Sequence, residues 1–237
     1  MRRFRFINGH RPAGLRMIER VVNQELIPTP RPSAVKELLG RQRLVLMLTV
    51  LLVELTIFFI ATSVPMDVAT QHVLQNESKE ITGASNGLAP AGQLVYIFTH
   101  NAAIAFGEMV PLIGGLLWVV SIYATGQVFQ AVALSQGVPG ALYGLLLLFF
   151  PFAIVELSAY AVAVSSGIML IVAWRRRLLR SETRVLVLEA GVVAVMLLVA
   201  AAMETVTILN PVLGIALWIP IGFTIAAMAL ISGRLRR

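Results

Sequence analysis

The stretch that decides the fold is PFAIVELSAYAVAVSSGIMLIVAWRRR, residues 151–177. Before its three closing arginines it holds one charged side chain, that of Glu156. A helix rises about 1.5 Å per residue, so this apolar run can cross the ~30 Å hydrocarbon core of a bilayer. The sequence therefore predicts a transmembrane helix over 152–174 that ends at a basic cluster.

The composition of the whole chain agrees with a membrane protein. Of its 237 residues, 58% are hydrophobic and 13% are charged, whereas soluble domains have about 25% charged residues. The mean hydropathy is +0.84, and the chain has no cysteine. Disorder, a disulfide scaffold and an ordinary cytosolic enzyme are excluded. We expect an all-α fold, a polytopic transmembrane helical bundle.

Further apolar runs are long enough to cross a bilayer, at 44–64, 93–110, 111–134, 185–208 and 212–231. With 152–174 they predict about six spans, with Asn210-Pro211 as the turn between the last two. A re-entrant hairpin over 93–134 would instead leave four full crossings with the same charge pattern. We prefer six because each half of that region is long enough to cross.

The basic residues predict the orientation in the membrane. Of the 19 Lys and Arg residues, 18 lie before residue 44, between 175 and 184, or after 233. Such clusters mark the cytoplasmic side, so both termini should be cytoplasmic in a multi-pass protein of the cell membrane. The chain then divides into a basic N-terminal region, a transmembrane domain with an outer polar loop, and a basic tail: 1–43, 44–232 with its loop at 65–92, and 233–237.

The N-terminal region has a pattern of its own. Apolar residues recur at helical spacing over 15–26 between basic and acidic ones, which predicts an amphipathic helix on the inner leaflet. Ser33 can cap a short second helix over 34–41. This region either binds lipid headgroups or docks a cytoplasmic partner.

One apolar segment is too long for a single crossing. Ala141–Trp174 has 34 residues, which is ~51 Å of straight helix. Pro151 lacks a backbone donor and should break it, leaving 140–150 as a short half-helix that is re-entrant or lies at the outer interface. Gly140 and Gly144 form a G-x-x-x-G pattern, which is typical of close helix packing. Irregular backbone at membrane depth needs cover from protein or water, so a functional site is expected nearby.

A few polar residues fall inside the apolar runs, where a charged group costs about 2.5–3.5 kcal/mol. The candidates for an intramembrane polar site are Glu156, Glu204, Asn101, Glu54 and His100. Glu108 and Glu189 lie nearer the inner side and should reach headgroups or cap turns. No Lys or Arg lies within a predicted span, so we expect these carboxylates to have no buried basic partner.

Counting residues places two of the acids at one depth. Glu156 precedes Arg175 by 19 residues and Glu204 follows Arg184 by 20, which is ~28 and ~30 Å of helix from one cytoplasmic hairpin. Glu156 also shares a helix face with Ala163 and Gly167, small residues typical of helix contacts. Glu156 could equally be a structural hydrogen-bonding group between helices.

The sequence lacks the patterns of common enzymes and metal sites. It has no Gly-rich phosphate loop, no His-Glu-x-x-His and no Gly-x-Ser-x-Gly. His100 has no second histidine in its span, so no metal is expected. We predict a protein that is not an enzyme and binds no cofactor or nucleic acid.

Three segments carry a family resemblance. Pro151–Ala159 resembles the Pro-His-Gly-Ile-x-Glu-Leu-x-Ala segment of the stage II sporulation protein M family. Phe98–Asn101, with the later glycines up to Thr125-Gly126, resembles the family's Asn-bearing helix and Asn-Gly. Ala201–Glu204 resembles its late Ala-Ala-x-x-Glu. The resemblance covers about 95–207, with three departures: Phe152 for His, Ala153 for Gly and Thr125 for Asn.

This resemblance implies a polytopic, non-enzymatic membrane protein. The residues of this chain that match functional positions of the family's motifs are Pro151, Glu156, Asn101 and Glu204. In sporulating bacteria the family works in a membrane complex that supports septal wall remodelling, beside separate wall-degrading partners. Other bacteria and archaea carry family members without sporulating, so that role is not carried over to this chain.

The leading prediction is a membrane component or scaffold of a multiprotein assembly, resembling stage II sporulation protein M. Its partners would be the lipid bilayer and membrane or cytoplasmic proteins, and a homo-oligomer is compatible with the sequence. The alternative is a transporter or permease-like protein that uses Glu156 and Glu204 beside the broken helix. An intramembrane enzyme is disfavoured because a nucleophile and a base are missing.

Overall fold

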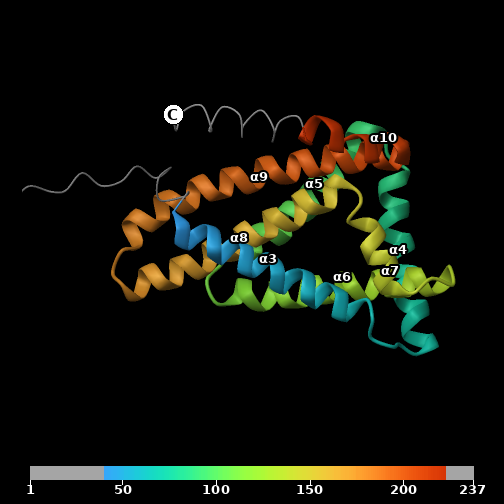
Figure 1. Cartoon of the computed structure of the whole chain (residues 1–237), viewed down its shortest axis with the longest axis horizontal. Coiled ribbons are helices and arrows are strands. Elements are labelled where there is room, and N and C mark those ends of the chain that lie inside the picture. The colour runs from blue at the N-terminus through green and yellow to red at the C-terminus, as the bar shows by residue number, and fades with distance from the viewer. Residues whose placement is uncertain (1–39, 223–237) are drawn as a thin grey trace, which may run out of the picture.

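The computed structural model describes residues 40–222, and helices are the only regular secondary structure in that range. The expected all-α fold is confirmed, and the helices pack as a bundle (Figure 1). The amphipathic helix expected over 15–26, most of the short helix over 34–41 and the tail 233–237 lie outside the described residues.

The helices are α3 Arg41–Ala61, α4 Val68–Asn86, α5 Pro90–Glu108, α6 Ile113–Ser135, α7 Gly140–Leu147, α8 Pro151–Arg175, α9 Leu179–Leu209 and α10 Pro211–Ala216. Four of them, α3, α6, α8 and α9, are long and apolar enough to cross a membrane. Six spans are therefore not confirmed within residues 40–222. The run expected over 212–231 begins as α10 and continues beyond the described range.

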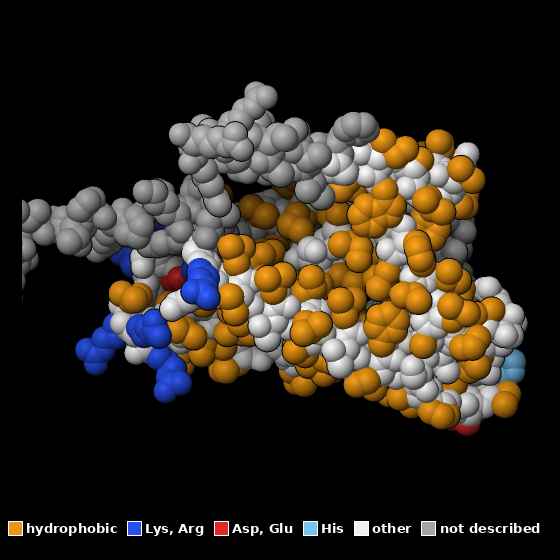
Figure 2. Space-filling model, viewed as in Figure 1, with side chains coloured by type: hydrophobic (Ala, Val, Ile, Leu, Met, Phe, Trp, Pro, Cys, Tyr) orange, Lys and Arg blue, Asp and Glu red, His pale blue; other side chains and the backbone are white. Residues whose placement is uncertain are grey.

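The long helices α3, α5, α6, α8 and α9 extend along the long axis of the molecule, while α4, α7 and α10 gather at one end of it (Figure 1). Basic side chains gather at the opposite end, where α8 turns into α9, and apolar side chains cover most of the rest of the visible face (Figure 2). The bundle therefore has one basic end and an apolar body, as the charge clusters in the sequence indicate.

Helix α8 is the centre of the packing. Its residues 161–167 are all buried, and most of them are small: Ala161, Val162, Ala163, Val164, Ser165, Ser166 and Gly167. Small side chains let neighbouring helices approach closely. One core cluster joins α8 to α5 and α9, and a second joins it to α3 through Val50. The acidic residue on α8 is thereby held among several neighbouring helices.

The helix break at Pro151 agrees with the sequence prediction. Helix α7 ends at Leu147, and α8 begins at Pro151, whose missing N–H costs nothing in a first turn. A Cβ at Gly140 would overlap the Gln130 Oε1 atom and a backbone carbonyl, and a Cβ at Gly144 would lie 2.8 Å from the Phe58 ring. The G-x-x-x-G pattern therefore packs α7 closely against α3 and α6.

The segment expected as a polar outer loop, 65–92, is mostly the helix α4. Asp67 caps it: its Oδ1 accepts from the Thr70 N–H at 3.0 Å, and its Oδ2 from the Thr70 hydroxyl at 2.7 Å. These bonds, chiefly that from the Thr70 hydroxyl, lower the pKa of Asp67. Gln75 ties α4 to α6 by donating to the Ala131 carbonyl at 3.0 Å. The sequence predicts a loop here because the segment is mostly polar, whereas the structure has a helix.

The turn between α5 and α6 lies nearer the middle of the long axis than the turn between α8 and α9 (Figure 1). A Cβ at Gly167 of α8 would be 3.1 Å from the Met109 carbonyl oxygen, so the turn packs against this glycine. Gly167 precedes Arg175 by eight residues, or about 12 Å of helix. The turn therefore stops about 12 Å short of the basic end. Its exposed side chains are apolar: Val110, Leu112 and Ile113.

Candidate functional site

Four carboxyl groups, one from each of four helices, form a series inside the bundle in which each lies within electrostatic range of the next. Glu54 of α3 and Glu108 of α5 are 1% and 2% exposed, and Glu156 of α8 and Glu204 of α9 are half-buried. Glu54 lies within electrostatic range of both Glu108 and Glu156. Glu156 in turn lies within range of Glu204. We call these four residues the acidic centre.

Tyr160 connects members of the acidic centre. It lies one helical turn after Glu156 on α8, and its hydroxyl donates to the Glu156 Oε1 atom at 3.2 Å. The same phenol is within electrostatic range of Glu54 and Glu108. Tyr160 therefore places a polar hydroxyl among three carboxyl groups.

Two of these carboxyl groups are incompletely bonded. The Ser121 hydroxyl donates to the Glu108 Oε1 atom at 2.9 Å, which ties α5 to α6. The buried Oε2 atoms of Glu54 and Glu108 have no hydrogen-bond partner among residues 40–222. The Trp118 side chain lies beside Glu54, but its indole N–H is also unbonded within the described chain. Burying polar atoms without partners is costly, so this arrangement points to a role for them.

A second polar cluster lies toward the basic end of the bundle. Arg43 of α3 is 5% exposed and donates from Nη1 to the Glu189 Oε1 atom at 2.6 Å. Its Nη2 atom pairs with Glu182. We call Arg43, Glu182 and Glu189 the arginine cluster. A charge-assisted network such as this one fixes the start of α3 against α9.

The arginine cluster corrects two expectations. Glu189 does have a buried basic partner, and it is 2% exposed rather than placed among the headgroups. The reason is that α3 begins at Arg41, so that Arg43 is part of the packed helix. The sequence did contain one sign of this cluster: Glu182 and Glu189 are seven residues apart, which puts both on one face of α9.

The other candidate residues divide between the interior and the surface. Asn101 is 8% exposed and shares a face of α5 with Glu108, seven residues later. Glu108, expected near the inner surface, instead belongs to the acidic centre. His100 is exposed and points away from that face, so it is not part of the centre. Successive side chains on an α-helix are rotated by about 100° from each other, so His100 and Asn101 lie on different faces of α5.

Helix α8 connects the two polar clusters. The Ser166 hydroxyl lies within hydrogen-bonding reach of the Glu189 carboxyl group and donates to the Val162 carbonyl at 2.8 Å. The next residue, Gly167, faces the backbone carbonyl of Glu108, at 3.2 Å from the position of a Cβ. The acidic centre and the arginine cluster thus lie along the same helix, with the Gly167 packing contact between them.

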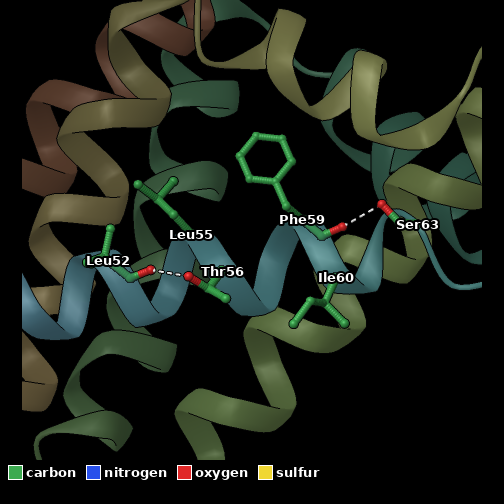
Figure 3. A pocket seen from close by; sticks show the side chains of 6 residues that line it. All are labelled: Leu52, Leu55, Thr56, Phe59, Ile60 and Ser63. Carbon is green, nitrogen blue, oxygen red and sulfur yellow. Dashed lines mark hydrogen bonds between the residues drawn. The ribbon is translucent and has the colours of Figure 1, made fainter.

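A shallow groove of about 450 Å³ on α3 is separate from this site (Figure 3). It is lined by Leu52, Leu55, Thr56, Phe59, Ile60 and Ser63. Its two hydroxyl groups donate to carbonyls of their own helix, Thr56 to Leu52 and Ser63 to Phe59, both at 2.7 Å. The groove therefore offers an apolar surface suited to lipid chains, and none of the four acids lines it.

The described residues contain no group of three or more His, Cys, Asp and Glu side chains placed to hold a metal ion. No protein-family model, curated protein or solved structure matches the chain. The site must therefore be interpreted from its own chemistry. It is a set of protonatable groups from several helices in the interior of an apolar bundle.

Proposed function

We propose that the chain is a multi-pass protein of the cell membrane with both termini in the cytoplasm. The full crossings would be α3, α8, α9 and the run over 212–231, with α5 and α6 as a re-entrant hairpin. The hairpin is supported by its apolar turn, which stops about 12 Å short of the basic end. Its irregular backbone would be covered by α8.

Within this topology we infer that the protein moves a small ion or solute through the bundle. The observation that carries this inference is the acidic centre, in which carboxyl groups from four helices lie in series in the bundle interior, two of them with buried oxygens that lack partners among residues 40–222. Carboxyl groups there are expensive to insert and mark ion pathways or proton relays. Helices interrupted near the acids, as at Pro151, are typical of transport sites.

The test is transport by the purified protein in liposomes that contain a pH-sensitive or ion-sensitive dye. Glu156→Gln keeps the size of the side chain and removes the group that can gain or lose a proton, and should abolish the flux. Glu77→Gln, an exposed acid on α4, is the matched control and should leave the flux unchanged. Equal flux in the wild type and Glu156→Gln would disprove transport through the acidic centre.

A second function is favoured by a separate observation. Two residues that carry the resemblance to stage II sporulation protein M, Glu156 and Glu204, lie within electrostatic range of each other. A site shared by the two helices is compatible with a non-enzymatic membrane component of a larger assembly. Cross-linking in native membranes followed by affinity purification should then recover partners in fixed stoichiometry. A protein that purifies alone after cross-linking would count against this function.

A further inference from the structure

We propose that the species moved through the bundle is the proton, and that the acidic centre, Tyr160, Ser166 and Glu189 form its relay. This inference rests on the proposed transport function and adds the chemical class of the substrate. It is carried by the order of the groups along the bundle and by the buried oxygen atoms that lack partners.

The arrangement of the acids favours a proton over a metal ion. A hard cation such as Na⁺ or Ca²⁺ needs several oxygen ligands around one point. The acids of residues 40–222 form no such group, because they are spread from one helix to the next. A chain of single protonatable groups suits a proton, which is handed from one oxygen to the next.

The order of groups gives the path. From the outer side it runs through Glu204 to Glu156, and from there to Tyr160 and Glu54. Glu108 follows, within electrostatic range of Glu54. Ser166 and Glu189 form the inner end of the path. Gly167, the residue after Ser166, packs against the backbone carbonyl of Glu108, so the two parts of the path are neighbours in the bundle. Ordered water can bridge neighbouring groups that are not in direct contact.

The unpartnered oxygens are the receiving atoms. The Oε2 atoms of Glu54, Glu108 and Glu189 are buried and have no hydrogen-bond partner in the described part of the chain. In each step an O–H bond breaks on the donor and one forms on a lone pair of the next oxygen. A neutral carboxyl group thereby becomes a carboxylate as its neighbour becomes neutral. The proton enters at one face and leaves at the other, and no other reactant is consumed.

Arg43 lies at the inner end of the relay. Its guanidinium group donates to the Glu189 Oε1 atom and pairs with Glu182. The charged and titratable groups that face the relay come from four helices: Glu54 on α3, Glu108 on α5, Glu156 and Tyr160 on α8, and Glu204 on α9. The arginine cluster lies beyond them. A proton that reaches Glu189 must loosen the ion pair before it is released to the cytoplasm.

The experiment uses liposomes loaded with KCl and a pH dye, with the full chain reconstituted. Valinomycin in a low-potassium buffer makes the lumen negative and draws protons in. The wild type should acidify the lumen, and Glu54→Gln should fall to the rate of protein-free liposomes. Glu54→Asp keeps a titratable group and should restore part of the flux. Glu80→Gln on the exposed face of α4 is the control and should match the wild type.

The outcomes separate the two proposals. Proton flux that is lost in Glu54→Gln and partly regained in Glu54→Asp supports the relay. Uptake of sodium ions or another solute without proton flux overturns the relay and leaves transport in place. No flux of any species overturns both. Size-exclusion chromatography and circular dichroism check that Glu54→Gln is folded, since it must elute as a monodisperse protein with wild-type helix content. Proton flux equal to the wild type in this folded variant overturns the relay.

A second measurement is independent of transport. Difference infrared spectroscopy of the reconstituted protein detects the carbonyl band of protonated carboxyl groups. The relay requires such a band near neutral pH, and it should weaken in Glu54→Gln and Glu108→Gln. A wild-type spectrum with no protonated carboxyl band would overturn the relay even if another ion is transported.

Discussion

Arg43 and Glu189 are 146 positions apart in the chain and form a buried ion pair at 2.6 Å. The pair joins the first described turn of α3 to α9, and Glu182 adds a second carboxylate to the same guanidinium group. Because all three side chains are almost fully enclosed, neither acid can be compensated by solvent if the arginine is removed.

Replacing Arg43 should therefore destabilise the bundle strongly. Arg43→Ala leaves two buried carboxylates without a partner, and breaking a buried pair in this way costs about 3–5 kcal/mol. Arg41→Ala, at an exposed position two residues earlier, is the control and should change stability by less than about 0.5 kcal/mol. Unfolding in mixed detergent and SDS measures both. Equal effects of the two substitutions would contradict the buried pair.

The re-entrant hairpin can be tested by cysteine labelling, because the chain has no cysteine of its own. Leu112 in the α5–α6 turn is 72% exposed, and Leu178 in the α8–α9 turn is 55% exposed. In inverted membrane vesicles, Leu178→Cys should react with a membrane-impermeant maleimide. Leu112→Cys should react only with a lipid-soluble one, since its turn lies within the bilayer. Comparable labelling of both by the impermeant reagent would instead favour six full crossings.

Alanine substitutions at Gly140 and Gly191 test how closely α7, next to the helix break, packs against its neighbours. A Cβ at Gly140 overlaps atoms of Gln130 and Thr62, whereas a Cβ at Gly191 meets nothing within 4 Å. Gly140→Ala should lower the thermal stability by about 1–3 kcal/mol, the usual cost of overpacking. Gly191→Ala should be neutral or stabilise α9 by up to about 1 kcal/mol. The reverse order in thermal melts would show that α7 is not packed as described.

The cap of α4 should depend on pH. Hydrogen bonds from Thr70 lower the pKa of Asp67 in the folded protein, so the stabilisation is present at neutral pH. It is lost as the pH falls through this lowered pKa, below the value of about 3.9 for a free Asp. Asp67→Ala should speed hydrogen exchange in the first turn of α4 at pH 7, whereas Asp67→Ser keeps a capping oxygen and should change it little. Unchanged exchange in the alanine variant would show that the cap contributes nothing.

Local chemistry explains which parts of the fold could be predicted. The break at Pro151 follows from the covalent structure of proline, which acts wherever it interrupts a long helix. The common depth of Glu156 and Glu204 follows from counting residues along two helices that leave one hairpin. Both depend only on residues near one another in the sequence.

What could not be predicted depends on contacts between distant segments. The partner of Glu189 is Arg43; the spacing of Glu182 and Glu189 shows that the two acids share a face of α9, but it does not identify Arg43 as their partner. Glu108 joins the acidic centre because the α5–α6 turn packs against Gly167 and stops short of the basic end, which charge patterns cannot show. Helix α4 was missed because its composition is polar overall, although Asp67 and Thr70 do supply a capping pattern.

The position of Trp118 gives the molecule an optical reporter of its own. The chain has three tryptophans, and Trp118 is the one whose indole ring lies beside Glu54. Replacing Trp174 and Trp218 by Phe would leave a single emitter next to the most deeply buried acid of the centre. The wavelength and intensity of its emission should then follow changes in charge at Glu54 directly, without an added dye.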